Sequence, residues 1–102
     1  MGAIGADDFG KVLSREATAD GVNVKYQIVE SQPTGTCAVL ITDNNRSLCA
    51  NLAAANHFTK DHLDKSENFA LVENAQYFYI SVINHSLITN FVTFSFSIVL
   101  CL

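Results

Sequence analysis

Residues 32–56, QPTGTCAVLITDNNRSLCANLAAAN, have the pattern of a β-hairpin. Pro33 and Gly35 precede an apolar run over residues 37–41, and a second, weaker run covers residues 48–52. The polar bend between them is rich in Asp and Asn, which tolerate positive φ angles and hydrogen-bond their own backbone. The sequence therefore predicts two antiparallel strands that are joined by a tight turn.

A single arginine, Arg46, stands at the tip of this predicted hairpin, next to Asp43, Asn44 and Asn45. A tight turn needs no guanidinium, whereas a site that handles an anion uses its planar, permanently charged fork. Taken alone, the residue is more often a solvated turn arginine. The local sequence pattern is compatible both with a solvated turn arginine and with an anion-binding arginine.

Length and composition limit the class of protein. A chain of 102 residues holds one small domain, and 49% hydrophobic with 16% charged residues is not a disordered composition. A net charge of −4 with six Lys and Arg argues against nucleic acid as a partner. Three cysteines without CxxC spacing favour a reducing compartment, the cytoplasm or nucleus, and the N-terminus has no secretory signal pattern.

The remaining chain has the pattern of strands mixed with helices, which predicts the α/β fold class. We expect strands at residues 2–5, 22–30 and 76–80, a helical turn near residue 63 and a helix at 66–74. Asp7 is placed to cap a helix over residues 8–19, and Gly21 to end it. The helix is expected to bury one apolar face, made of Phe9, Val12, Leu13 and Ala17. The glycine spacing GxxGxDxxG differs from a dinucleotide fingerprint and indicates a strand–turn–helix.

The runs PTGTCAVLIT and DNNRSLCANLAAAN, with GAIGADDFG at residues 2–10, the HLD triplet and residues 71–80, carry a resemblance. Together they resemble the adenosine-kinase branch of the ribokinase (PfkB) family of sugar and nucleoside kinases, over about residues 1–80. The resemblance implies part of a Rossmann-like, three-layer ribokinase fold, in which the hairpin at about 35–53 belongs to a small lid. It also implies ATP-dependent phosphorylation of adenosine to AMP in purine salvage, with adenosine and ATP as partners.

The resemblance assigns roles to six residues of the predicted hairpin. Arg46 matches the family arginine that closes on the transferred phosphoryl group. Cys37, Leu48 and Ala50 match positions that wall the adenosine pocket, although ordinary strand packing explains them equally well. Asn44 and Asn45 match a pair, an acidic residue and then Asn, that is linked with a cation such as Mg²⁺. A neutral amide is a weaker ligand for a hard cation than a carboxylate, so a plain turn is the favoured interpretation there. His57 and His62 lack further ligands and predict no zinc site.

The family's DTxGAGD signature, which supplies the general base and an anion hole, does not occur in this sequence. We therefore expect the 102-residue chain by itself to show no turnover. The alternative function is a non-catalytic module that pairs through the exposed hairpin, with itself or with a complete kinase.

No Asp, Glu, Lys or Arg follows Glu73. This places a boundary near residue 80, and residues 81–102 form an apolar tail outside the family pattern. The preferred explanation is a truncated product, from a retained intron or a faulty gene model, whose end is translated sequence unrelated to the family. A tail anchor is the weaker alternative, because Thr, Ser and Asn interrupt the apolar stretch and no basic residue flanks it.

Overall fold

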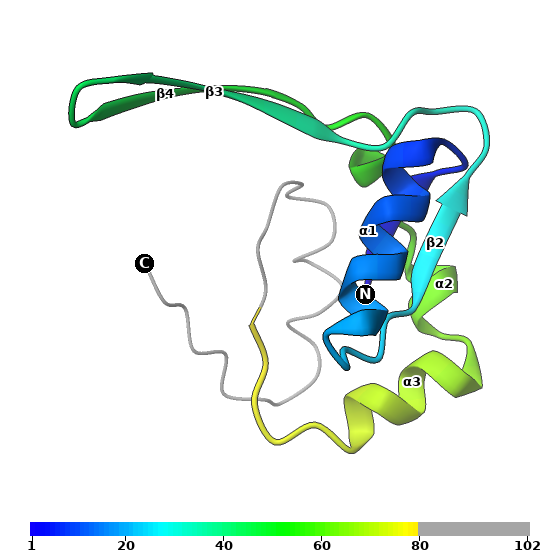
Figure 1. Cartoon of the computed structure of the whole chain (residues 1–102). Coiled ribbons are helices and arrows are strands. Elements are labelled where there is room, and N and C mark those ends of the chain that lie inside the picture. The colour runs from blue at the N-terminus through cyan, green and yellow to red at the C-terminus, as the bar shows by residue number, and fades with distance from the viewer. Residues whose placement is uncertain (80–102) are drawn as a thin grey trace. The chain divides into compact units, whose positions relative to one another are not determined.

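The computed structural model describes residues 1–79 (Figure 1). The chain divides into two units, Met1–Phe58 and the residues from Thr59 onward, and each is treated separately below. The predicted apolar tail, residues 81–102, lies outside the described residues.

The first unit is built on a strand–helix–strand motif. Strand β1 (Gly2–Gly5) is followed by helix α1 (Asp8–Ala19) and strand β2 (Tyr26–Val29). The two strands pair in parallel, from Gly2 opposite Tyr26 to Gly5 opposite Val29. A helical connection between parallel strands is the elementary unit of α/β folds. The predicted first strand and helix are confirmed.

A short 3₁₀ helix, η1 (Ala53–His57), packs on β1 and completes the buried centre of this unit. Ala3, Ile4 and Ala54 are the buried apolar residues, with Ala54 fully excluded from solvent. The side chain of Gln27 adds a hydrogen bond from Nε2 to the carbonyl oxygen of His57, at 3.1 Å. The centre is small because two short strands and one helical turn supply it.

Both ends of α1 are set by local chemistry. At its start, Asp7 has extended backbone angles and its Oδ1 accepts a hydrogen bond from the Gly10 N–H. At its end, Gly21 has a φ of +78°, which L-residues adopt at a cost. The Gly21 and Val22 N–H groups donate to the carbonyls of Thr18 and Ala17, forming a Schellman cap. Because Val22 belongs to this cap, β2 starts later than the predicted residue 22.

The predicted hairpin is confirmed. Strand β3 (Thr36–Thr42) pairs antiparallel with β4 (Asn45–Asn51) across the two-residue turn of Asp43 and Asn44. Asp43 has a φ of 53°, a conformation that Asx residues tolerate. Every residue of both strands is exposed, so the ribbon has no buried face within the first unit (Figure 1).

The prediction that α1 buries an apolar face is wrong. Phe9, Val12 and Leu13 are 67%, 45% and 44% exposed, and the buried residue of the helix is Gly10. The helical spacing predicts the helix correctly, but a helix face is buried only where another element covers it. In residues 1–58 the helix approaches β1 with its glycine side instead.

The second unit contains α2 (Lys60–Leu63) and α3 (Ser66–Glu73), close to the predicted helical turn and helix. Asn68 is 1% exposed, and its Nδ2 donates to the carbonyl oxygen of His62 at 2.6 Å. Lys60 and Asp64 form an ion pair one turn apart. In residues 1–79 no helix is long and apolar enough to cross a membrane.

The predicted buried strand at residues 76–80 is wrong for residues 76–79, the part that is described. These residues form no strand, and Tyr77 and Tyr79 are 88% and 79% exposed. A strand needs a neighbour that takes up its backbone hydrogen bonds. Each of the two sheets in residues 1–79 has two strands, and neither sheet includes this segment.

Candidate functional site

The register of the hairpin sorts its side chains onto two faces. Residues directly opposite each other in an antiparallel pair point to the same side, and the side alternates along the strand. Three pairs share one side, which we call the Arg46 face: Cys37 with Ala50, Val39 with Leu48, and Ile41 with Arg46.

The four residues predicted to contact substrate, Arg46, Cys37, Leu48 and Ala50, therefore lie together on one face. Cys37 and Ala50 stand at the base of the hairpin and Arg46 near its tip. Four residues of extended strand separate Ala50 from Arg46, a span of about 13 Å. The Arg46 face thus carries an apolar strip that ends in a permanent positive charge.

Val39 and Ile41 complete this strip, and the sequence interpretation did not include them. Both are exposed, Val39 to 50% and Ile41 to 76%. The signal that could have found them is the two-residue period. Once Cys37 is assigned to a face, Val39 and Ile41 follow on the same side.

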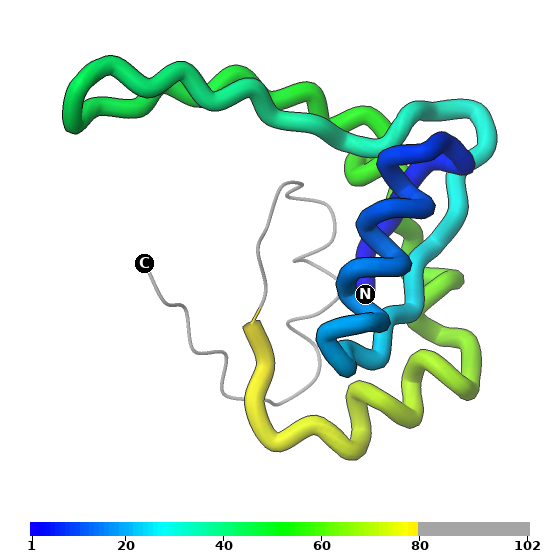
Figure 2. Tube along the Cα trace, viewed as in Figure 1, coloured from blue at the N-terminus to red at the C-terminus, as the bar shows by residue number. Residues whose placement is uncertain are grey.

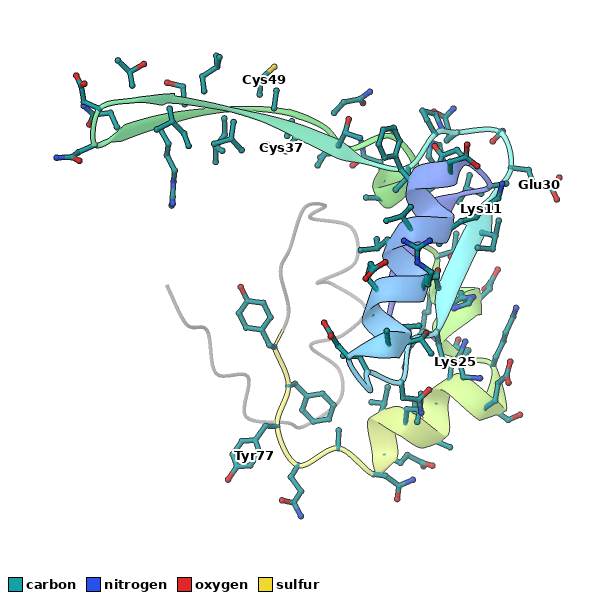
Figure 3. All side chains as sticks on the ribbon, in the orientation of Figure 1. Lys11, Lys25, Glu30, Cys37, Cys49 and Tyr77 are labelled. Carbon is teal, nitrogen blue, oxygen red and sulfur yellow. The ribbon has the colours of Figure 1, made fainter. Side chains whose placement is uncertain are left out.

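The opposite face carries Ala38 with Cys49 and Leu40 with Ser47. Cys37 and Cys49 are both free and exposed (Figure 3). The register also places them on opposite sides of the ribbon, because Cys37 pairs with Ala50 and Cys49 with Ala38. Two strands without a covering layer leave both sides of the ribbon open to solvent.

The two candidate metal residues occupy different positions at the tip. Asn44 lies in the turn, and Asn45 pairs with Thr42 on the side away from Arg46. In residues 1–79 no group of three or more His, Cys, Asp or Glu residues could hold a metal ion. The donors at the turn are one carboxylate, Asp43, and two neutral amides. This set fits Mg²⁺ only as a supplement to stronger ligands such as phosphate oxygens.

The structure brings a cluster of polar residues together at the base of the hairpin, which the sequence pattern does not predict as one unit. The chain runs from β2 back past the N-terminal end of α1 before it enters β3 (Figure 2). There Asp7 Oδ2 accepts a hydrogen bond from the Thr34 N–H at 2.8 Å, and Thr34 Oγ1 donates to Asp7 Oδ1 at 2.5 Å. The Thr34 hydroxyl, followed by the backbone N–H groups of Thr34 and Gly10, lowers the pKa of Asp7 from its usual value.

Comparison with known proteins identifies relatives of the chain. The family model described as pfkB family carbohydrate kinase matches residues 1–97. Adenosine kinase 2 of Arabidopsis thaliana is 54% identical over 81 residues, which are 79% of this chain and 24% of the relative. The adenosine kinase of Saccharomyces cerevisiae is 49% identical over 80 residues, 78% of this chain and 23% of the relative. The chain thus spans about a quarter of the length of these curated relatives.

Solved structures agree with the sequence comparison. The Anopheles gambiae adenosine kinase in complex with P1,P4-di(adenosine-5) tetraphosphate has a TM-score of 0.74 and 54% identity, covering 76% of this chain and 23% of that one. The Schistosoma mansoni enzyme in complex with adenosine, in an occluded loop conformation, has a TM-score of 0.73 and 36% identity, covering 78% and 23%. The predicted α/β, partial ribokinase-like fold is confirmed. With a family model that matches nearly its whole length, the chain belongs to the pfkB family of carbohydrate kinases.

Proposed function

We propose that this chain supplies the lid hairpin, and the strand–helix–strand unit that supports it, to an adenosine kinase. The reaction is the ATP-dependent phosphorylation of adenosine to AMP. The observation that carries the proposal is the 54% identity to adenosine kinase 2 of Arabidopsis thaliana over 81 residues, which include the whole hairpin motif. The relatives solved with adenosine and with a diadenosine tetraphosphate support the same substrate class.

The Arg46 face suits one side of a nucleoside site. Its apolar side chains can cover a base and exclude water, which strengthens electrostatic interactions at the reacting centre. The guanidinium of Arg46, near the tip, can bind the oxygens of the transferred phosphoryl group, where negative charge is spread in the transition state.

In the proposed reaction the adenosine 5′-oxygen forms a bond to the γ-phosphorus of ATP as the bond to the β–γ bridging oxygen breaks. ADP leaves with the electrons of that bond, and the 5′-hydroxyl proton passes to a carboxylate. The family signature for that carboxylate, DTxGAGD, does not occur in this sequence. The chain therefore contributes positioning and charge stabilisation rather than the general base.

Mg²⁺ is the proposed cation, and when bound it would offset the negative charge of the phosphate groups. Asn44 and Asn45 are the residues proposed to support it from the turn, through amide oxygens or intervening water. Their contribution is expected to be small, because neutral amides attract Mg²⁺ less than carboxylates do.

The proposal is tested by segment replacement. Residues 1–81 of this chain replace the matching segment of the Arabidopsis adenosine kinase 2, and the purified replacement enzyme is assayed for adenosine-dependent ADP formation with ATP and Mg²⁺. We expect activity within about tenfold of the parent enzyme, because more than half of the exchanged residues are identical.

Two controls accompany this assay. The 102-residue chain alone is expected to show no turnover, and inosine in place of adenosine measures specificity. A soluble, folded replacement enzyme that binds ATP but does not phosphorylate adenosine would contradict the proposed function.

A second candidate function is self-association through the hairpin. Each strand of this ribbon pairs along one edge only, and Leu40 and Leu48 are 67% and 62% exposed. Open strand edges and exposed apolar side chains favour strand addition. Size-exclusion chromatography at several concentrations tests this, and a Leu40→Lys variant is expected to shift the chain toward monomer. A monomer at every concentration would rule the second candidate out.

A further inference from the structure

Two sequence motifs that lie more than twenty residues apart meet at the base of the hairpin. GAIGADDFG contributes Gly5, Asp7 and Gly10, and PTG contributes Thr34. The Thr34 hydroxyl accepts a hydrogen bond from the Gly5 N–H at 2.9 Å while it donates to Asp7. We call this cluster of four residues the base node. Gly5, Gly10 and Thr34 are buried, with Thr34 7% exposed, whereas Asp7 is partly exposed.

The base node is closely packed as well as hydrogen-bonded. A Cβ atom on Gly5 would lie 2.6 Å from the Thr34 backbone nitrogen. A Cβ on Gly10 would lie 2.4 Å from the Gly5 carbonyl oxygen and 3.0 Å from Thr34 Oγ1. Both glycines are therefore needed for the close approach of β1, α1 and the segment that leads into β3.

The segment that follows β4 is also held next to the base node. The Ala54 N–H donates to the carbonyl oxygen of Pro33 at 3.0 Å, and a Cβ on Gly35 would lie 2.8 Å from the Leu52 carbonyl oxygen. Thr34 is two residues before the first residue of β3. The segments that enter and leave the ribbon are thus held side by side next to the base node.

A helix cap alone does not explain this arrangement. Capping α1 requires one Asp7 oxygen and the Gly10 N–H. The second Asp7 oxygen and the hydroxyl of Thr34 are directed instead at the connection into the hairpin. Because all of β3 and β4 is exposed, no buried contact farther along the ribbon fixes its direction.

We propose that Asp7 and Thr34 are positioning residues that set the direction in which the hairpin leaves the α/β unit, and that they act on the reaction through Arg46. This inference rests on the proposed function. Seven residues of extended chain separate Thr34 from Ile41, which pairs with Arg46. The distance along the strand between Thr34 and Ile41 is therefore about 23 Å. A tilt of about 5° at the base moves the tip by about 2 Å, and errors of about 1 Å can cost about a hundredfold in rate.

The first test uses the 102-residue chain and amide hydrogen exchange measured by NMR. Thr34→Val removes the hydroxyl and keeps the shape of the side chain, and we expect the Gly5 amide to exchange at least about tenfold faster. The Val22 amide, bonded to Ala17 in the distant helix cap, is expected to be unchanged. Thr34→Ser is expected to restore protection.

The matched control for this test is Thr18→Val. The Thr18 hydroxyl donates to the Ser14 carbonyl on the exposed side of α1, away from the base node. We expect it to leave the Gly5 amide unchanged. An unprotected Gly5 amide in the unaltered chain, or one that Thr34→Val does not affect, would overturn the proposal.

The second test is a double-mutant cycle in the replacement enzyme described above. Thr34→Val is expected to lower kcat at least about tenfold when Arg46 is present, and less than about twofold in the Arg46→Ala background. Thr34→Ser should recover most of the loss. An equal loss in both backgrounds would mean that Thr34 does not act through Arg46, and the proposal would fail.

The two tests separate the two claims. An inactive replacement enzyme counts against the proposed function, whereas the exchange measurement still decides whether the base node exists. If Thr34→Val lowered kcat without changing the hydrogen-exchange protection of the Gly5 amide, loss of the base node would not be the cause of the lower kcat.

Discussion

At the scale of single residues, Asp7 illustrates how one carboxylate serves two purposes. Its Oδ1 caps α1 through Gly10, and its Oδ2 holds the Thr34 N–H. All these donors favour the charged carboxylate, which is why the pKa of Asp7 is lowered. The sequence predicted the cap from Asp7's position, but the contact to Thr34 depends on a fold that brings residues 27 positions apart together.

This lowered pKa predicts how the stability of the first unit depends on pH. The folded-state pKa lies below the unfolded value of about 3.9, so the stabilisation is complete above that value. It is lost as the pH falls through the folded pKa. We expect the difference in urea midpoint between the unaltered chain and Asp7→Asn to be constant at higher pH and to shrink as the pH falls below about 4.

Asp8→Asn is the matched control for this measurement, because Asp8 lies next to Asp7 in an exposed ion pair with Lys11. Its effect on the midpoint is expected to be smaller at every pH. A difference between Asp7→Asn and the unaltered chain that stays constant with pH would contradict the assignment of Asp7's contacts.

At the scale of elements, close packing decides between two opposing effects at Gly10. Alanine in place of an interior helix glycine normally stabilises by up to about 1 kcal/mol. Here the added Cβ would lie 2.4 Å from a backbone oxygen, and such overpacking costs about 1–3 kcal/mol. We therefore expect Gly10→Ala to lower the free energy of unfolding, measured by urea titration, while the neighbouring exposed Lys11→Ala changes it little. Equal or higher stability of Gly10→Ala would refute the close approach.

The two faces of the hairpin allow a second prediction at this scale. Val39 lies on the Arg46 face and Leu40 on the opposite face. In the replacement enzyme, Val39→Thr is expected to raise the KM for adenosine about threefold to tenfold, because the proposed site would then hold a hydroxyl against the base. Leu40→Thr serves as the control and should leave KM within about twofold. The reverse order would mean that the opposite face meets the substrate.

Elements with a strong local signal were predictable from the sequence. The sequence predicts the hairpin and α1 because alternation, Asx turns and caps are local patterns. Burial was not predictable in the same way. The apolar face of α1 and the segment 76–79 both look buried by composition, yet burial depends on a neighbouring element that a sequence pattern does not reveal.

At the scale of the whole molecule, the proposed function requires a general base whose family signature this chain does not carry. The chain spans 24% of the Arabidopsis relative and lacks the signature of the general base. The grouping of Arg46, Cys37, Leu48 and Ala50 on one face follows from the register, whereas their roles in substrate binding remain a proposal. The boundary near residue 80 and the roles of Asn44 and Asn45 stay predictions.

The measurement that tests the central claim most directly compares two arginines in the replacement enzyme. Arg46 lies near the hairpin tip, and Arg15 lies on the exposed side of α1 in an ion pair with Glu16. We expect Arg46→Ala to lower kcat for adenosine phosphorylation about 10²- to 10⁴-fold, because the transferred phosphoryl group loses its charge partner. Arg15→Ala should leave kcat within about twofold. If Arg46→Ala retained nearly full kcat, the hairpin would not be the phosphoryl-binding lid of an adenosine kinase.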